Sequence, residues 1–399
     1  MMQRTVLVLA ASVYQLDAIR TARRLGYRTV TVDNRPENPG HAMADASYTV
    51  DTTDRDGVLE VARRESIAGI VSPCTDVAVP TAAYVAEQLG LPGPPFKSTL
   101  ITCSKSAFRG FLKAHKFACP ETFDIDPTFE PEPGLFDRKW VVKPNRSSGS
   151  KGVVIVDSRA SFDRALHSSL AFDPDRTGVL EEFIGGVDGT CEGFLRDGRI
   201  AFSLLLERVT APAPHVATHG HRVPIRLSPV DRKRVLETIR EVLRALDIVE
   251  GPFDCDFIVR PDDVVILEIS PRLGGNSITP LVRASTGLDL TELTLRSACR
   301  DEVAIPADVE ERPAGLVLLG TSRSGVLALD LDEVERLRLE SWVVYLELDA
   351  TPGTAVEAFI DGRKRVGEAL LTGASREQVD ERAAELLRRV NVRALEAHV

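Results

Sequence analysis

The segment FDCDFIVRPDDVVILEISPR, residues 253–272, has the pattern of two β-strands joined by a short turn. If Arg260 pairs with Val264 across this turn, the two residue numbers of every opposed pair add up to the same value. Asp256 then lies directly opposite Glu268. Two carboxylates at that spacing repel each other unless a cation lies between them. Hard oxygen ligands suit Mg²⁺, so the pattern predicts a magnesium site on this hairpin.

Ser270 and Arg272 continue the second strand of the hairpin. Asp254 and Ser270 lie on the same faces one pair further out. The guanidinium of Arg272 can grip a phosphoryl or carboxylate group through two hydrogen bonds. A shift of one residue in the register would place the two acids on opposite faces, and they would then be ordinary exposed acids. Both interpretations stay open at the level of the sequence.

The chain has 399 residues, of which 43% are hydrophobic, and this length favours two or three domains. A net charge of −10 argues against a nucleic-acid or anionic-membrane partner, which would be repelled at long range. The six cysteines form no C-x-x-C pair, so neither a disulfide framework nor a thiolate zinc site is indicated. No stretch approaches the ~18 apolar residues of a membrane span. We therefore expect a cytoplasmic protein, neither secreted nor inserted in a membrane.

The first hundred residues alternate short β-branched runs with amphipathic helical segments, beginning with TVLVLA at residues 5–10. This alternation of strand-like and helical segments predicts a parallel, doubly wound sheet. Its first turn, LAASV at residues 9–13, lacks the G-x-G-x-x-G pattern, which disfavours a nicotinamide or flavin oxidoreductase. The Pro-rich segment LPGPP at residues 91–95 ends this unit, because proline removes backbone donors and glycine loosens the chain.

The segment KWVVKPNRSSGSKGVVIV, residues 139–156, predicts two strands joined by a Gly/Ser-rich loop. Its small residues allow backbone N–H groups to point at an anion, and Lys143 and Lys151 add flanking positive charges. The loop is neither a Walker loop nor a kinase glycine loop. A phosphate-binding hairpin and a mobile hairpin tip are the two interpretations of this segment.

The segment VLEEFIGGVD, residues 179–188, is a predicted strand that runs into a glycine turn. A strand end of this kind can present backbone C=O and N–H groups to a purine edge, with acidic side chains reaching ribose hydroxyls. Two exposed glutamates on a strand end are the alternative. The histidines of HVATHGH, residues 215–221, have spacing compatible with zinc. The segment contains no carboxylate or cysteine and has loop character, so zinc is disfavoured and a substrate-covering loop is expected.

These motifs together resemble the ATP-grasp superfamily, and within it the carboxylate–amine ligases that make peptides and related amides. VVKPNRSSGSKGV is similar to the family's phosphate-binding hairpin, and EEFIGGVDG to its adenine hinge. LEISPRLGG is similar to the motif E-I-N-P-R-x-G-G. The resemblance covers the whole chain in outline and is most specific across residues 139–275.

The resemblance implies roles for individual residues. It implies ATP contacts for Lys105, Lys143, Ser148, Gly149, Ser150, Glu181, Glu182, Phe183, Ile184, Asp188 and Glu268. It implies metal ligation by Asp256, Glu268 and Ser270, catalysis by Lys143, Arg272 and Gly275, and substrate contacts for His215, His221, Arg272 and Gly274. Lys105 by itself is an ordinary helix lysine and gains its role from the resemblance alone. Ser270 stands where asparagine is the usual third ligand, which leaves open whether one or two metal ions bind.

The resemblance also implies a mixed α/β and α+β architecture. We expect an N-terminal Rossmann-like domain over residues 1–100 and an ATP-grasp domain over residues 101–310. Within the latter a flexible lid is expected over about residues 120–185. A small C-terminal α+β domain is expected over residues 311–399.

The implied reaction is ATP-dependent formation of an amide bond through an acyl phosphate, with release of ADP and phosphate. ATP and Mg²⁺, which Mn²⁺ can replace, are the implied cofactors. The implied partners are a small carboxylic acid and an amine, such as amino acids or their derivatives, and the resemblance allows a homodimer. Two alternatives stay open. One is a carboxylase or formate-activating enzyme of the biotin carboxylase or purine-biosynthesis type. The other is a nucleotide-binding regulatory protein without turnover.

Overall fold

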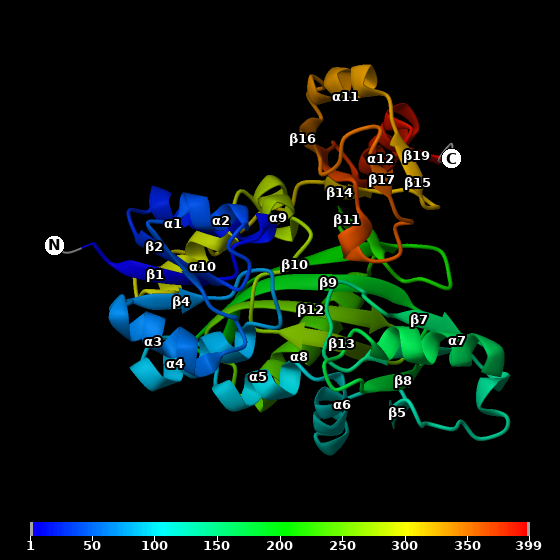
Figure 1. Cartoon of the computed structure of the whole chain (residues 1–399), viewed down its shortest axis with the longest axis horizontal. Helices are drawn as coiled ribbons and strands as arrows, with labels where there is room; N and C mark the ends of the chain where they lie inside the picture. Colours follow the sequence, from blue (N-terminus) through cyan, green and yellow to red (C-terminus); the bar gives the residue numbers. More distant parts are fainter. Residues whose placement is uncertain (1–2, 397–399) are drawn as a thin grey trace.

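The computed structural model describes residues 3–396, which form four β-sheets with helices packed around them (Figure 1). None of the helices in this part of the chain combines the length and the apolar character that crossing a membrane requires.

The N-terminal sheet is parallel and has the strand order β3-β2-β1-β4. Its strands are β1 (Thr5–Leu9), β2 (Arg28–Asp33), β3 (Ala46–Thr49) and β4 (Gly69–Val71), and its helices are α1 (Leu16–Arg24), α2 (Pro39–Met43), α3 (Arg55–Arg64) and α4 (Val79–Leu89). Alternate side chains of β1 point to opposite faces. Leu7 and Leu9 pack with α3 and α4, while Val6 and Val8 pack with α1 and with α10 (Leu290–Ala298) from much later in the chain. The predicted doubly wound sheet is therefore confirmed.

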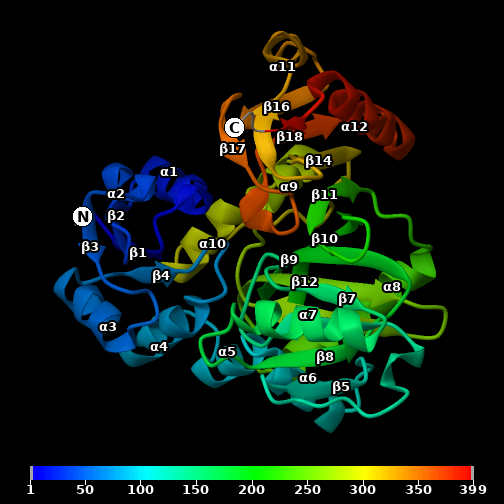
Figure 2. The ribbon, with the colours of Figure 1, turned by 45° about the vertical axis from the view of Figure 1, so that its right-hand side comes forward.

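Two helices, α5 (Phe96–Thr102) and α6 (Lys105–Ala114), connect this unit to a smaller antiparallel sheet, which lies within the predicted lid and is called the lid below. The lid is a four-stranded antiparallel sheet of order β5-β8-β6-β7. Its elements are β5 (Thr122–Ile125), β6 (Trp140–Pro144), β7 (Val154–Val156), α7 (Arg159–Leu170) and β8 (Gly178–Glu182). Trp140 and Phe162 are fully buried between the sheet and α7 and form the core of the lid. Figure 2 shows the lid beside the large sheet.

The large sheet has eight antiparallel strands in the order β13-β12-β9-β10-β11-β14-β18-β16. These are β9 (Val187–Arg196), β10 (Arg199–Thr210), β11 (Thr218–Val223), β12 (Gly251–Val259), β13 (Val264–Ser270), β14 (Ala314–Leu319), β16 (Val343–Leu348) and β18 (Gly367–Thr372). Helices α8 (Pro229–Ala245) and α9 (Ile278–Thr286) pack against it in separate apolar clusters.

The C-terminal segment adds three strands to this sheet and also forms α11 (Leu331–Arg338), α12 (Arg376–Val390) and a small sheet of β17 (Ala355–Val356), β15 (Gly325–Ala328) and β19 (Arg393–Leu395). One sheet therefore runs across residue 310, and the domain boundaries given above remain predictions.

Next to the turn, the pairing of β12 with β13 differs from the predicted pairing. Val259, not Arg260, opposes Val264, and the Arg260 N–H donates to the Asp263 carbonyl at 2.9 Å. A β-bulge then leaves Leu267 as an extra residue on β13. The bulge shifts the pairing by one residue, so that Asp256 does oppose Glu268. The assumed turn pairing was wrong, and the predicted acid pair is confirmed.

Candidate functional site

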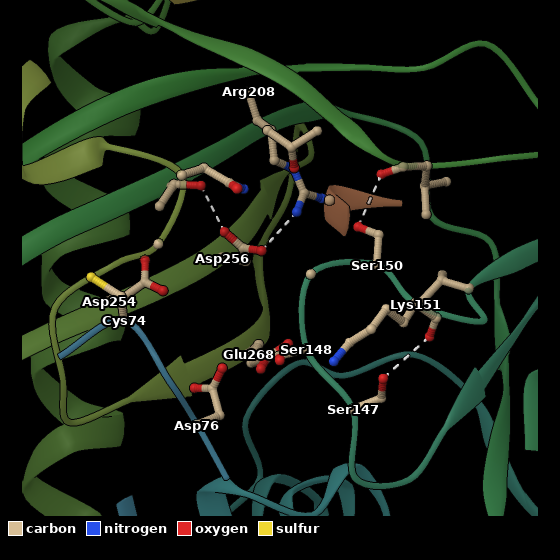
Figure 3. A pocket seen from close by; sticks show the side chains of 18 of the residues that line it. Cys74, Asp76, Ser147, Ser148, Ser150, Lys151, Arg208, Asp254, Asp256 and Glu268 are labelled. Atoms are coloured by element: carbon tan, nitrogen blue, oxygen red, sulfur yellow. Dashed lines mark hydrogen bonds and ion pairs between the residues drawn. The ribbon is translucent and has the colours of Figure 1, made fainter. Parts of the chain in front are cut away.

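A cavity of about 270 Å³ lies where the N-terminal unit, the lid and the large sheet meet (Figure 3). Its wall includes residues from all of these parts and from the C-terminal segment. They are Tyr14, Cys74, Asp76, Lys105, Lys143, Ser147, Ser148, Gly149, Ser150, Lys151, Val153, Thr190, Arg208, Val216, Thr218, His221, Asp254, Asp256, Leu267, Glu268, Arg272, Gly275, Asn276, Ile278, Gly362 and Arg363.

One face of the large sheet carries a row of polar side chains across five neighbouring strands. His221 on β11 opposes Arg208 on β10, Thr190 on β9 opposes Asp256 on β12, and Asp256 opposes Glu268 on β13. The antiparallel pairing sets these side chains on adjacent rungs of the sheet. The sequence folds this way because each strand turns alternate residues to this face, and their partners to the apolar clusters behind.

Asp256 has two polar partners in this row. The Thr190 hydroxyl donates to its Oδ1 at 2.6 Å, and Arg208 pairs with its Oδ2 at 2.6 Å. Glu268 lies on the neighbouring strand, and burial, together with the nearby charge of Asp76, raises the pKa of its carboxyl. A cation beside these two acids would remove their mutual repulsion.

Arg272 lines the cavity and is held between two acids. Its Nη2 lies 2.7 Å from the Asp76 carboxylate, and its Nη1 pairs with Asp254. Burial raises the pKa of Asp254 to about 6, although Arg272 opposes this shift. The Ser270 hydroxyl donates to Asp76 Oδ1 at 2.9 Å. Asp76, which follows β4, therefore orients both Arg272 and the predicted third metal ligand.

Lys143 and Glu181 form a buried ion pair beneath the hairpin loop, with Nζ 2.6 Å from Oε2. Arg109 Nε lies 2.8 Å from the other carboxylate oxygen, and both side chains of this second pair are almost fully buried. Burial alone would raise the pKa of Glu181, but Arg109 and Lys143 together lower it to about 2. The Glu181 side chain thus orients Lys143, which lines the cavity.

The other predicted adenine-hinge residues lie outside the cavity wall. Glu182 pairs with Arg138, and Phe183 is 41% exposed. Ile184 packs in a small apolar cluster that reaches the cavity through Leu267. An apolar cluster of this kind suits a purine ring, and the assignment of the hinge to adenine remains a prediction. Asp188 lies nearby on β9 and pairs with Arg208 at 2.9 Å.

The Gly/Ser-rich loop closes the cavity with Ser148, Gly149 and Ser150 in its wall. Gly149 and Ser150 both have positive φ, 67° and 58°, which turns the loop sharply. Three other parts of the chain hold the loop. Lys105 Nζ donates to the Ser147 carbonyl at 3.0 Å, the Gly362 N–H donates to the Gly149 carbonyl at 3.1 Å, and the Ser150 hydroxyl donates to the Val216 carbonyl at 3.4 Å.

The histidines separate in the fold. His221 lies in the cavity wall, is 2% exposed and has no hydrogen-bond partner for Nδ1. Burial lowers its pKa to about 3, so the ring is uncharged at neutral pH. His219 stacks on Phe359, and His215 pairs with Val154 of the lid rather than lining the cavity. The structure therefore brings His221, and not His215, to the site.

The two glycines after Arg272 have different surroundings. Gly275 lines the cavity, whereas Gly274 packs against the fully buried Glu192. The Gly274 carbonyl accepts a hydrogen bond from the Cys74 thiol. Burial raises the pKa of Cys74 to about 12, so this group is a thiol and not a nucleophile.

The donor set fits a magnesium nucleotide. Among residues 3–396 no group of three or more His, Cys, Asp or Glu side chains is arranged to hold a metal ion by itself. Asp256 and Glu268 would supply two carboxylates, and phosphate oxygens would complete the shell, as is common for Mg²⁺. Lys105, Lys143 and Lys151 around the same cavity would neutralise the phosphates.

Several residues of the site were not predicted. Asp76 follows the carboxyl end of a parallel strand, where ligands often bind in α/β sheets, and this signal was available in the sequence. No sequence signal pointed to Arg109, Arg208 or Arg363, because charged residues on a helix, a strand and a turn are usually solvated.

Three family models match successive parts of the chain. They describe an ATP-grasp N-terminal domain over residues 19–93, an ATP-grasp domain over residues 102–276, and an L-amino acid ligase C-terminal domain 2 over residues 319–394. A formate-dependent phosphoribosylglycinamide formyltransferase from Burkholderia lata is 28% identical over 395 residues, covering 95% of this chain and 93% of that protein.

Two solved structures share the fold. An L-amino acid ligase from Bacillus licheniformis is similar with a TM-score of 0.83 and 19% identity, over 99% of each chain. A phosphoribosylglycinamide synthetase from Anaerococcus prevotii is similar with a TM-score of 0.77 and 16% identity, over 98% of this chain and 100% of that one. ATP-grasp enzymes use ATP and Mg²⁺. The family models and the cavity agree, and the chain is an ATP-dependent ligase of the ATP-grasp family.

Proposed function

We propose that this ligase joins a small carboxylic acid to an amine through an acyl phosphate and releases ADP and phosphate. One observation carries the proposal. The opposed acids Asp256 and Glu268 lie in the same cavity as Lys143 and as Arg272, which two acids hold in place. The match of the C-terminal segment to an L-amino acid ligase domain supports an amino acid or a derivative as the substrate.

The first step activates the acid, because a carboxylate is a poor electrophile with a poor leaving group. A carboxylate oxygen of the substrate forms a bond to the γ-phosphorus, and the bond from that phosphorus to ADP breaks. Lys105, Lys143 and Lys151 would neutralise the negative charge around the transferred group. Mg²⁺ held by Asp256 and Glu268 would supply further charge neutralisation.

The second step forms the amide. The amine nitrogen forms a bond to the carbonyl carbon, and the bond from that carbon to the phosphate oxygen breaks. The nitrogen loses a proton, which the departing phosphate takes up. Arg272 would stabilise the negative oxygen of the tetrahedral intermediate, together with the backbone near Gly275. His221 is uncharged at neutral pH and can accept a hydrogen bond from the attacking amine.

The Gly/Ser-rich loop would protect the acyl phosphate from water. Its tip is tied by hydrogen bonds to Lys105, to Val216 and to Gly362, so three separate segments hold it over the cavity. Water excluded in this way cannot hydrolyse the activated acid before the amine reacts.

Hydroxylamine trapping tests the proposal. The protein is incubated with ATP, Mg²⁺, hydroxylamine and a panel of amino acids and other carboxylic acids. The expected result is a hydroxamate of at least one acid, formed together with equal amounts of ADP and phosphate. ATP turnover with no hydroxamate from any organic acid on the panel would count against amide formation.

A second candidate function rests on the 28% identical formate-dependent relative from Burkholderia lata. In this function the activated acid is formate or bicarbonate. ADP release that requires formate or bicarbonate, and that other acids do not support, would favour it.

A further inference from the structure

We propose that Arg208 is the internal counter-ion of Asp188 and Asp256, and that Mg²⁺ binds to Asp256 only by displacing this guanidinium. The inference rests on the proposed role of Asp256 as a metal ligand. Arg208 is thereby a positioning residue that makes metal binding depend on the nucleotide.

Arg208 bridges two acids that lie on neighbouring strands. Arg208 reaches across from β10, and its Nη1 lies 2.6 Å from Asp256 (Figure 3). Its Nη2 lies 2.9 Å from Asp188. Only 14% of its side chain is exposed, against 28% for Asp188 and 26% for Asp256. The guanidinium therefore lies deeper than the acids it joins, and its Nε has no hydrogen-bond partner.

Most of the charged groups around Arg208 are acids. Glu268 faces the same space from β13, so Arg208 lies among three carboxylates, counting its two partners. Lys143 adds positive charge from the lid, and His221 on β11 is uncharged at neutral pH. Removal of one partner from a buried ion pair leaves an uncompensated charge, which is strongly destabilising. Without Arg208 the three acids would need another cation.

Arg208 and a metal ion would compete for Asp256. Arg208 Nη1 pairs with Asp256 Oδ2, and the Thr190 hydroxyl donates to Oδ1, so both oxygens of Asp256 have a donor. A metal ion on Asp256 and a guanidinium at hydrogen-bond distance from the same oxygen would repel each other. Nucleotide phosphates offer Arg208 new acceptors for charge-assisted hydrogen bonds. Free Mg²⁺ offers none, so it should bind weakly until the nucleotide arrives.

Binding of Mn²⁺ to the nucleotide-free protein, followed by electron paramagnetic resonance, tests the inference without turnover. Arg208→Gln is expected to raise the affinity for Mn²⁺ by at least about tenfold over the unsubstituted chain, because the carboxylates lose their internal cation. The double variant Arg208→Gln with Asp256→Asn should lose this gain. Arg389→Gln removes a different arginine, which pairs with Glu333, Glu340 and Glu385, and should leave the affinity unchanged.

An unchanged Mn²⁺ affinity in Arg208→Gln, or a gain that survives Asp256→Asn, would overturn the inference. If Arg208→Gln does not fold, Arg208→Lys takes its place. A lysine ammonium has no fork with which to hold two acids. It should therefore give a smaller gain, and no gain at all would overturn the inference. The readout is metal binding, so failure here is distinguishable from failure of the hydroxylamine assay.

Discussion

Asp256 on β12 faces Glu268 on β13 across a β-bulge at Leu267. The bulge frees the Leu267 carbonyl from the strand ladder, and Arg109 Nη2 donates to it at 2.8 Å. The same arginine pairs with Glu181, which holds Lys143. One buried guanidinium therefore joins the proposed metal-binding strands to the lysine of the lid, and fixes both sides of the proposed phosphate site relative to each other.

Removal of either opposed acid should abolish most of the turnover. Asp256→Asn and Glu268→Gln are each expected to lower kcat by about 100-fold or more, because charge stabilisation of the phosphoryl group is lost. ADP release over a range of Mg²⁺ concentrations measures the effect. Asp262→Asn, in the exposed turn of the same hairpin, is the matched control and should keep full activity. Wild-type kcat for either acid variant at saturating Mg²⁺ would contradict the assignment.

Arg363 should keep ATP use coupled to product formation. Its guanidinium lies 4.9 Å from the centre of the Phe172 ring, and the neighbouring Gly362 N–H binds the tip of the loop. Arg363→Ala removes a cation–π contact that is worth about 1 kcal/mol. This loss corresponds to a roughly fivefold rise in the KM for ATP. More ADP than amide should also form, because water reaches the acyl phosphate.

Lys364→Ala is the matched control for this prediction, since Lys364 pairs with Glu357 and does not line the cavity. The ratio of ADP to amide, measured by chromatography, distinguishes the two variants. An equal ratio in both would show that the Arg363 side chain does not keep water from the acyl phosphate.

Gly274 and Gly275 should respond differently to alanine. A Cβ on Gly274 would come within 1.8 Å of Glu192 Oε1, whereas a Cβ on Gly275 has nothing within 4 Å. Overpacking of this kind costs about 1–3 kcal/mol. Thermal unfolding should therefore show a lower Tm for Gly274→Ala and an unchanged Tm for Gly275→Ala. Equal melting temperatures would mean that Glu192 moves aside without cost.

Stability at acid pH should depend on Glu181. Its pKa in the folded chain is about 2, below the ordinary value of 4.5. The stabilisation is therefore fully present above about pH 4.5 and is lost as the pH falls toward 2. The shift corresponds to a contribution on the order of 3 kcal/mol. Glu181→Gln should be less stable by about this amount at pH 7, with a difference that shrinks between pH 4.5 and 2.

Chemical denaturation across this pH range measures the effect. Glu182→Gln is the control, because the Glu182 side chain is 32% exposed and lies outside the Arg109 and Lys143 pairs. A Glu181→Gln profile parallel to that of the unsubstituted chain would refute the prediction.

Features that depend on neighbouring residues could be predicted from the amino-acid sequence. Alternating β-branched runs predicted the parallel sheet, and small residues predicted the loop between β6 and β7. The pairing of Asp256 with Glu268 was predicted from a turn register that was wrong by one residue, and the bulge at Leu267 restored the pairing. The bulge at Leu267 could not be predicted, since Arg109, which is distant in the sequence, donates the hydrogen bond to the freed carbonyl.

The tertiary structure alone decided which distant side chains complete the site. Asp76 reaches Arg272 from another sheet, Arg208 reaches Asp256 across β9, and Gly362 reaches Gly149 from the C-terminal segment. Such contacts close long loops of chain, so they are determined by strand order and packing, and local preference does not encode them. Strand alternation is a property of a few adjacent residues, whereas the ion pairs of the cavity form only once four separate parts of the chain have packed together.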